Sequence, residues 1–254
     1  MKSKNIEFQG SSGVNLAARI DMPDSEKPTA TLLFAHCFTC NKNLKAVGHI
    51  TRALTRQDIG VFRFDFTGLG ESEGDFAEST FSTDVADLVA AAKYMKQEWI
   101  APSIIMGHSL GGAAALQAAA QIDSTQAVCT VGSPCNPQHV EHLLSDKKEE
   151  IERKGEANVV LAGRPFKIKK KFLDDLDQQV MDGVIQNLNR ALLIFHSPVD
   201  QTVSIDNAAH IYKMARHPKS FVSLDDADHL LMKEEDAVYV GEVTTAWASR
   251  YFRD

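Results

Sequence analysis

Residues 104–112 read Ile-Ile-Met-Gly-His-Ser-Leu-Gly-Gly, and this stretch decides the fold. Its first three residues are all apolar, which is typical of a strand covered on both faces of a sheet. The alanine-rich residues after Leu110 predict a helix. Ser109 therefore stands on the turn between a buried strand and a helix. Gly107 and Gly111 allow the backbone to turn sharply there and allow the helix to pack against the strand.

Apolar strands and amphipathic helices alternate along most of the chain. Further apolar runs predict strands at Thr31–Ala35, Val61–Asp65, Ala127–Val131, Leu192–Phe195 and Phe221–Leu224. Apolar residues at helical spacing predict helices over residues 44–54, 85–95, from 204 onward and over 240–251. This alternation requires right-handed crossovers and predicts an α/β fold, with a mostly parallel central sheet and helices on both faces.

The pattern changes in two places. Ile6–Phe8 and Val14–Asp21 alternate between polar and apolar residues around a glycine-rich turn, so they predict an antiparallel hairpin. Residues 135–189 are longer than an ordinary crossover and combine a charged start, an extended piece at 158–161 and an apolar helical stripe from Leu173 to Leu188. We predict one domain over residues 1–254, in which residues 135–189 form a lid or cap over the carboxyl ends of the strands.

Composition argues against several classes of function. The 254 residues carry a net charge of −7, which argues against nucleic acid as the main partner. The first ten residues lack the apolar segment of a secretory signal, and no run approaches the roughly 18 apolar residues of a membrane span. Four cysteines do not indicate a disulfide scaffold in a chain of this size. We expect a cytoplasmic protein without a membrane partner, and the sequence leaves its oligomeric state open.

A serine needs a base and an acid to become a nucleophile, and chain order selects them. On this kind of strand–turn–helix unit the order is Ser, acid, His. Asp200 directly follows the strand that ends near Phe195, and His229 follows the strand that ends at Leu224. Both thus lie at the same sheet edge as Ser109. We predict that His229 takes the proton of Ser109, while Asp200 orients the imidazole and stabilises its charged form.

Other residues compete less well for these roles. Three aspartates are nearer to His229 in the sequence but cannot easily reach its far ring nitrogen: Asp225, Asp226 and Asp228. We interpret His108 and His196 as packing or supporting residues. His139 and His142 have the H-x-x-H spacing of metal ligands but no further ligands beside them, so we expect no metal and no cofactor. The basic run Lys167–Lys171 is interpreted as a solvated face.

The loop Ala35-His-Cys-Phe-Thr-Cys40 follows the strand Thr31–Ala35. In this kind of fold an oxyanion hole is formed by the N–H after the nucleophile and by an N–H of this loop. The predicted donors are the backbone N–H groups of Leu110 and Phe38. Each such donor can change the rate by about a hundredfold or more.

Cys37 and Cys40 have the C-x-x-C spacing of a redox pair. Thioredoxin-like pairs open a helix in a different context, whereas this loop already has a role for its backbone. We therefore interpret the spacing as coincidental, although Cys37 would be open to oxidation beside the site. A redox role would predict activity that survives Ser109→Ala but is lost in Cys37→Ser.

Taken together, the motifs resemble the α/β-hydrolase domain that is found fused ahead of a domain like osmotically inducible protein C (OsmC). The matching stretches span nearly the whole chain: His36–Cys40, Arg63–Gly74, Gly107–Ala113, Leu161–Phe166, His196–Asp200, His217–Leu224 and Ala227–Leu231. The resemblance implies an α/β-hydrolase fold and a serine-triad hydrolase, and it supports the roles given to Ser109, Asp200, His229, Phe38 and Leu110. An OsmC-like domain is expected only in relatives, so its thiol peroxidase activity is not carried over.

We expect an esterase that transfers the acyl group of a small-molecule carboxylic ester to Ser109. Short-chain or small aromatic acyl groups are the first expectation. A thioesterase or amidase would use the same machinery, so the scissile bond stays open. A non-catalytic interaction module of the same fold is the alternative from another class. Such a module would be expected to lack a triad residue, and none is missing here.

Overall fold

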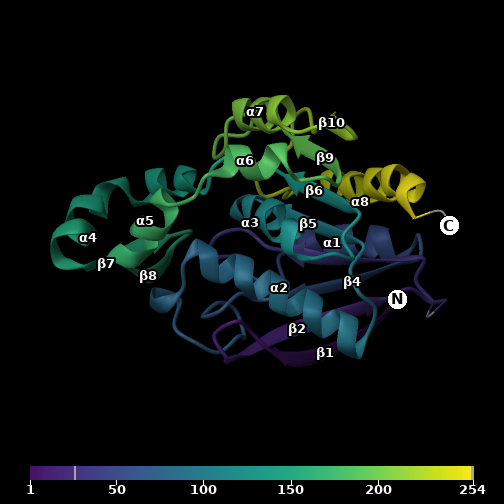
Figure 1. Cartoon of the computed structure of the whole chain (residues 1–254), viewed down its shortest axis with the longest axis horizontal. Helices are drawn as coiled ribbons and strands as arrows, with labels where there is room; N and C mark the ends of the chain where they lie inside the picture. Colours follow the sequence, from purple (N-terminus) through teal and green to yellow (C-terminus); the bar gives the residue numbers. More distant parts are fainter. Residues whose placement is uncertain (26, 253–254) are drawn as a thin grey trace.

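The structure is a computed structural model that describes residues 1–25 and 27–252. In this part of the chain, eight strands form the central sheet in the order β1-β2-β4-β3-β5-β6-β9-β10. Figure 1 shows this sheet between its flanking helices. Its strands are β1 (Lys2–Gln9), β2 (Asn15–Met22), β3 (Ala30–Ala35), β4 (Ile59–Phe64), β5 (Ile104–His108), β6 (Ala127–Val131), β9 (Ala191–His196) and β10 (Lys219–Ser223).

Most neighbouring strands of the sheet are parallel. β1 and β2 form the predicted antiparallel hairpin, and β2 also pairs antiparallel with β4. Every later pairing, from β4–β3 to β9–β10, is parallel. The predicted α/β architecture with a mostly parallel sheet is therefore confirmed. Because parallel strands end at one edge, the residues that follow β3, β5, β6 and β9 are brought together there.

Helices cover both faces of the sheet. α1 (Lys45–Thr55) and α8 (Glu234–Ala248) pack on one face, whereas α2 (Phe81–Glu98), α3 (Leu110–Ala118) and α7 (Asp206–Met214) pack on the other. In β3, Leu32 and Phe34 join the core under α1 and α8, while Leu33 and Ala35 join the core under α2 and α3. Apart from Thr31, the strand is apolar because its side chains alternate between two buried faces.

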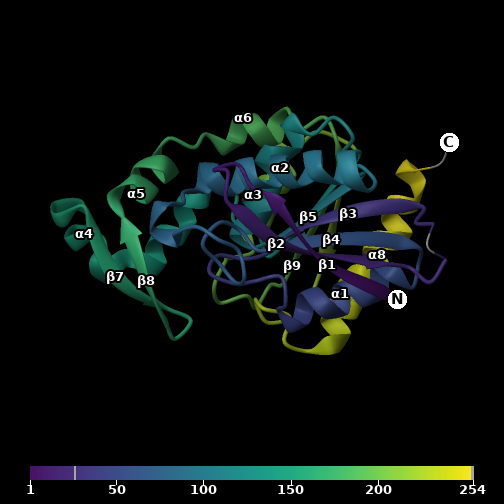
Figure 2. The same ribbon diagram turned by 90° about the horizontal axis from the view of Figure 1, so that it is seen from below.

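Residues 132–190, between β6 and β9, form an inserted segment much longer than one crossover helix. Its elements are η3 (Pro137–Lys147), α4 (Lys148–Lys154), β7 (Glu156–Leu161), β8 (Arg164–Lys169), α5 (Lys170–Asp177) and α6 (Met181–Gln186). β7 and β8 pair antiparallel in a separate small sheet. α4, β7, β8 and α5 lie together at one end of the molecule, whereas α6 returns to contact α3 and α7 (Figures 1 and 2).

The inserted segment differs from its sequence pattern in two respects. The apolar stripe is divided between α5 and α6, and Val180 between them is 76% exposed. Strand β8 was not predicted, because its lysines obscure any apolar alternation. The lysines of the basic run form partly exposed ion pairs with Glu156, Glu78 and Asp174. Such exposed pairs contribute little to stability, as expected for a solvated face.

Short 3₁₀ helices complete the described chain: η1 (Phe76–Glu78), η2 (Ala119–Gln121) and η4 (Ser249–Tyr251). The last predicted helix is thus divided, since Trp247 lies in α8 and Tyr251 in η4. Among residues 1–25 and 27–252, no helix combines the length and apolar character needed to cross a membrane.

Candidate active site

Ser109 lies on the turn between β5 and α3. Its backbone has φ 54° and ψ −127°, a conformation that residues other than glycine rarely adopt. The Ser109 N–H donates to the Val131 carbonyl at 2.9 Å, which fixes the turn against the end of β6. Backbone held in such a region by its surroundings clusters at functional sites. Here it presents a hydroxyl at the amino end of a helix.

The glycines around Ser109 stand where two backbones touch. A Cβ at Gly107 would lie 2.1 Å from the Gly111 carbonyl oxygen, and one at Gly111 would lie 2.4 Å from the His36 carbonyl oxygen. Neither position has room for a side chain, so α3 packs directly against the ends of β3 and β5. This close approach is the reason predicted for the two glycines.

A chain of hydrogen bonds joins the three predicted triad residues. The Nε2 atom of His229 lies 3.0 Å from the Oγ atom of Ser109, and its Nδ1 atom lies 2.7 Å from the Oδ2 atom of Asp200. The three residues follow β5, β9 and β10, so the parallel sheet brings them to one edge. Asp200 and His229 sit on the two loops where sequence order placed them.

Asp200 is held as a carboxylate. Its side chain is 2% exposed, and burial alone would disfavour ionisation. The hydrogen bond from the His229 ring and those from the N–H groups of Val203 and Thr202 outweigh that burial, so the pKa of Asp200 lies below its ordinary value. The arrangement orients His229 with Nδ1–H toward Asp200 and leaves Nε2 free to accept a proton.

The side chains of two of the three competing aspartates have other partners. Asp228 accepts the backbone N–H groups of Leu230 and Met232, and Asp226 forms an ion pair with Lys233. Both contacts shape the loop around His229 without reaching the imidazole ring. Gly132, which was not singled out from the sequence, lies beside the ring instead. It has φ 55°, and a Cβ there would lie 3.3 Å from both Asp200 Oδ2 and His229 Nδ1.

Two further histidines, His108 and His196, hold the loops that carry His229 and Asp200. The Nε2–H of His108 donates to the His229 carbonyl at 2.7 Å, and the Nε2–H of His196 donates to the Val203 carbonyl at 2.8 Å. Burial, reinforced by the nearby His229, lowers the pKa of His108 to about 3, and burial also lowers the pKa of His196. Both are therefore neutral donors that hold the loops carrying His229 and Asp200, as their supporting role predicted.

Loop 36–42, between β3 (Ala30–Ala35) and α1 (Lys45–Thr55), carries Phe38, one of the two predicted oxyanion donors. Leu110 is the first residue of α3, where N–H groups lack acceptors within the helix. His36, which is 2% exposed, donates from Nδ1 to the Cys37 carbonyl at 2.8 Å and accepts the Phe66 N–H on Nε2 at 3.3 Å. Burial lowers the pKa of His36, so it stays neutral in this bridging role. The start of the loop is thereby fixed to the chain that follows β4.

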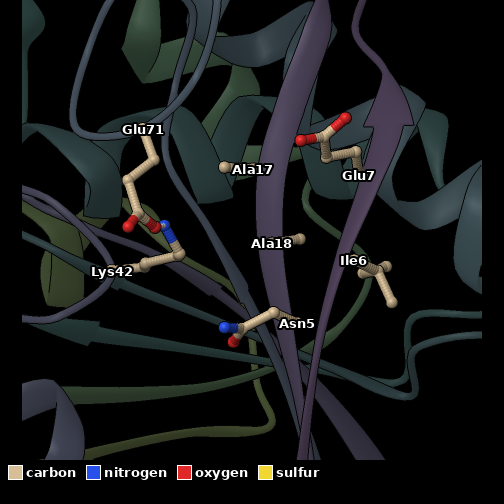
Figure 3. Close-up of a pocket in the computed structure, with 7 residues that line it drawn as sticks. All are labelled: Asn5, Ile6, Glu7, Ala17, Ala18, Lys42 and Glu71. Carbon is tan, nitrogen blue, oxygen red and sulfur yellow. Dashed lines mark hydrogen bonds and ion pairs between the residues drawn. The ribbon is translucent and has the colours of Figure 1, made fainter.

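The far end of loop 36–42 is held by a buried ion pair. Lys42 is 3% exposed and Asp65 is fully buried, and they are joined twice, at 2.6 Å through the Lys42 N–H and at 2.6 Å through its Nζ atom. The Nζ atom also forms an ion pair with Glu71, and the two side chains lie together in the wall of an open cavity of about 570 Å³ (Figure 3). None of the predicted site residues lines that cavity. Arg63 completes the anchor by donating to the Lys42 carbonyl at 2.6 Å.

Cys37 and Cys40 form a disulfide, with their Cα atoms 5.3 Å apart. The interpretation of the C-x-x-C spacing as coincidental is therefore wrong. The reason is a tight turn, closed by the Cys40 N–H donating to the Cys37 carbonyl at 3.0 Å, which brings both sulfurs to one side. Thr39 at the third position of this turn has φ 61°. Cys129 and Cys135 are free.

The inserted segment contacts loop 36–42 directly. The Phe38 ring stacks on Phe172 at 5.5 Å between centroids and lies 5.7 Å from Phe76, which in turn contacts Phe166 at 5.0 Å. Arg164 donates a hydrogen bond to the Thr39 carbonyl. An aromatic cluster of Phe38, Phe76, Phe166 and Phe172 thus joins the segment to the residue that carries the predicted oxyanion donor.

His139 and His142 remain close together in η3, with ring centroids 4.6 Å apart. Each has a backbone contact, His139 with the Thr202 carbonyl at 2.9 Å and His142 with the His139 carbonyl. Among the described residues, no group of three potential ligands is placed to hold a metal ion.

The sequence analysis assigned no role to His36 or Gly132, although both directly follow buried strands that end at the same edge as Ser109.

The parallel sheet, the serine on its strained turn and the Ser–Asp–His order define the class: the chain belongs to the α/β-hydrolase family. A family model described as serine aminopeptidase, S33, matches residues 26–146. The esterase domain of a Rhodothermus marinus protein is 46% identical in sequence and has a TM-score of 0.82, with 100% of each chain covered. The predicted family and fold are thus confirmed, and the chain is a hydrolase by family.

Two further comparisons give lower sequence identities. Est1E of Butyrivibrio proteoclasticus, in a structure with ferulic acid bound, is 18% identical with a TM-score of 0.81, covering 96% of this chain and 98% of that one. The uncharacterised protein YfhR of Salmonella typhimurium is 20% identical over 205 residues, which are 81% of this chain and 66% of that protein. This chain therefore spans slightly less than two thirds of that relative. None of these likenesses tests an OsmC association, which stays a prediction.

Proposed function

We propose that this chain is a serine esterase that hydrolyses small carboxylic esters through an acyl-enzyme on Ser109. The observation that carries the proposal is the continuous chain of contacts from Asp200 through His229 to Ser109, at 2.7 and 3.0 Å. The Rhodothermus marinus esterase domain supports an ester as the scissile bond, because 46% identity extends over both whole chains.

Acylation begins when Ser109 Oγ attacks the ester carbonyl carbon. His229 Nε2 takes the hydroxyl proton, and Asp200 stabilises the imidazolium that forms. The carbonyl oxygen becomes an oxyanion that accepts the N–H groups of Phe38 and Leu110. When the tetrahedral intermediate collapses, the alkoxide leaves with the proton from His229, and the acyl group stays on Ser109.

Deacylation repeats these steps with water. His229 removes a proton from a water molecule, the hydroxide attacks the acyl carbon, and the same two N–H groups stabilise the second oxyanion. Ser109 then leaves with the proton held on His229, and the carboxylic acid departs. No cofactor, metal or redox partner takes part in this sequence, and the proposed partner is the small-molecule ester alone, with neither nucleic acid nor membrane.

We assign the inserted segment, including residues 135–189, the role of a lid over this site. Its contacts with Phe38 and Thr39 support this role, because both residues belong to the loop that supplies an oxyanion donor. Phe38 and Phe76 are half-buried, which leaves apolar surface for an acyl group of short-chain or small aromatic character. A cytoplasmic location remains part of the proposal.

The proposal is tested by hydrolysis of p-nitrophenyl esters of increasing acyl length, with wild type beside Ser109→Ala. Turnover by the wild type that disappears in the variant is expected, and the length profile measures the pocket. Turnover that persists in Ser109→Ala would contradict the acyl-enzyme. Matched thioester and anilide substrates determine whether a thioesterase or amidase describes the enzyme better. If no substrate turns over, labelling of Ser109 by a fluorophosphonate separates an unreactive module from an enzyme of narrow range.

A further inference from the structure

Loop 36–42 contains a chemical group that ester hydrolysis does not use, the disulfide between Cys37 and Cys40. We propose that this disulfide is a dithiol-exchange site that positions the oxyanion donor, so that its reduction lowers acyl transfer to Ser109. The inference rests on the proposed esterase function. It assigns to this chain a second reactive site, whose reaction partner is a dithiol reductant.

The disulfide encloses the residue whose N–H is the predicted donor. Cys37 and Cys40 are the first and last residues of a four-residue turn, and Phe38 and Thr39 are the two residues between them. The orientation of the Phe38 peptide is therefore fixed from both sides. The Phe38 N–H belongs to the peptide between Cys37 and Phe38, whose carbonyl accepts from His36 Nδ1 and from the Cys40 N–H. Opening of the turn would break the second of these contacts and let that peptide shift.

Thr39 makes this turn unfavourable without a cross-link. Its φ of 61° places a β-branched residue in the left-handed region, where glycine or asparagine is usual at this position of a turn. Once the disulfide is reduced, one hydrogen bond from the Cys40 N–H to the Cys37 carbonyl closes the turn. The other contacts of the loop hold the Cys37 carbonyl, the Phe38 ring and the Thr39 carbonyl, but none of them fixes the Thr39 backbone dihedral.

The two cysteines differ in exposure, which favours attack on one of them by a dithiol. Cys37 is 4% exposed, whereas Cys40 is only partly buried. A thiolate of the reductant attacks Cys40 Sγ, the sulfur–sulfur bond breaks, and Cys37 Sγ leaves with the electron pair and takes a proton. The second thiolate of the reductant then attacks the mixed disulfide and releases Cys40. Two electrons and two protons pass to the protein, and the dithiol becomes a cyclic disulfide.

In a reducing compartment, this exchange reaction would make the rate of ester hydrolysis depend on the redox state. Disulfides in such compartments are usually transient and serve catalysis or redox sensing. In the cytoplasm, where we place the chain, the pair would report the dithiol balance through the rate of ester hydrolysis. The lid would be affected as well, because Arg164 and Phe172 hold the same turn.

The experiment compares one preparation in the oxidised and the dithiothreitol-reduced state. Thiol counting in denaturant should give two free thiols in the first state and four in the second, since Cys129 and Cys135 are free in both. With p-nitrophenyl acetate, reduction should lower kcat by about ten- to a hundredfold, approaching the loss of one oxyanion donor. KM should change much less, and reoxidation should restore kcat.

Two variants sharpen the comparison. Cys135→Ser removes a free, half-buried thiol and should respond to dithiothreitol as the wild type does. The double variant with Cys37→Ser and Cys40→Ser should show the low kcat in both conditions. Unchanged or higher kcat in fully reduced wild type would overturn the proposal.

Failure of the esterase function itself would give a different result. No turnover by the oxidised enzyme would count against the esterase proposal only. The disulfide would then be tested by amide hydrogen exchange of residues 36–42, which should become faster on reduction. Equal exchange in the two states would overturn the positioning role of the disulfide.

Discussion

The two loops that meet at Ser109 are held in place by opposite means. Residues 107–112, here called the nucleophile turn, are held by close backbone packing that only glycine allows. A Cβ would lie 2.1 Å from a carbonyl oxygen at Gly107 and 2.4 Å from one at Gly111. Loop 36–42 is fixed by side chains that bind it to the rest of the molecule: His36, the Cys37–Cys40 disulfide and Lys42.

This difference predicts which kind of substitution disturbs each loop. Adding atoms should damage the nucleophile turn, whereas removing atoms should damage loop 36–42. A third substitution tests the chemistry alone, because the negative charge of Asp200 can be removed without changing the contacts of either loop.

The largest effect is expected from Asp200→Asn. The amide oxygen can still accept the N–H groups of Thr202 and Val203, but its NH₂ would donate to His229 Nδ1. The imidazole would then carry its proton on Nε2 and could not accept one from Ser109. We expect kcat for p-nitrophenyl esters to fall by up to roughly ten-thousandfold, as for the equivalent change in a serine protease.

The control for this change is Asp228→Asn, in which the acid removed lies next to His229 in sequence but binds the Leu230 and Met232 N–H groups. The two N–H groups bind different carboxylate oxygens, and the Asn amide can accept only one of them. A small loss of kcat is therefore expected, far below that of Asp200→Asn. The opposite result, with Asp200→Asn active and Asp228→Asn inactive, would move the acid to Asp228.

Lys42→Met tests the removal of atoms from loop 36–42. It leaves the fully buried Asp65 without its partner, and breaking a buried ion pair in this way costs about 3–5 kcal/mol of the free energy of unfolding. Urea denaturation measures the loss. Lys45→Met, three residues further on and exposed, should change stability by less than about 0.5 kcal/mol. If the two variants were equally stable, Lys42 would not anchor the loop.

Gly111→Ala tests the addition of one carbon to the nucleophile turn. Its Cβ would lie 2.4 Å from the His36 carbonyl and 2.6 Å from the Ala35 carbonyl, so α3 must move away from β3 and carry Ser109 with it. A displacement of about 1 Å lowers turnover by roughly a hundredfold.

Gly48→Ala in α1 is the matched control for Gly111→Ala. Nothing lies within 4 Å of its added Cβ, and it should stabilise the helix by up to about 1 kcal/mol without changing kcat. Equal turnover in the two variants would show that the nucleophile turn tolerates a side chain.

The smallest effect concerns His108 and pH. Its pKa is lowered from 6.5 to about 3 by burial, so below pH 6.5 the unfolded chain binds a proton that the folded chain does not. The contribution of His108 to stability is complete above pH 6.5 and is lost as the pH falls toward 3, by up to about 1.4 kcal/mol per pH unit.

Gln at position 108 keeps a donor for the His229 carbonyl but does not titrate in this range. Urea denaturation between pH 7 and pH 4 should therefore show a shallower loss of stability in His108→Gln than in wild type. Parallel curves would contradict the neutral state assigned to His108.

Most of the sheet could be predicted from the sequence, because strands buried on both faces are short and mostly apolar. Ala127–Val131 was predicted with the bounds of β6 itself. The residues of the Asp200–His229–Ser109 chain were also predictable, since parallel strands bring their carboxyl ends to one edge and chain order then leaves few choices. Whether those residues act as proposed is a matter for the variants above.

The inserted segment and the disulfide were not predictable in the same way. β8 contains Lys167 and Lys169, and Glu78, the ion-pair partner of Lys169, is distant in sequence. The bond between Cys37 and Cys40 depends on the left-handed backbone of Thr39, and nothing in the identity of a threonine indicates such a conformation. In the first case, long-range contacts override the local pattern, and in the second a backbone conformation that is unusual for threonine does so.

The hydrogen bond between His229 and Ser109 joins residues 120 positions apart. It therefore forms only after β6 has paired with β9 across the inserted segment and β10 has joined the edge of the sheet. Pairings this distant in sequence are slow to form, because the chain must lose the entropy of a long loop before it gains their contacts. During refolding, the far-UV circular dichroism of the helices should thus return before ester hydrolysis does. The recovery of enzymatic activity would then report the rate of the last stage of folding.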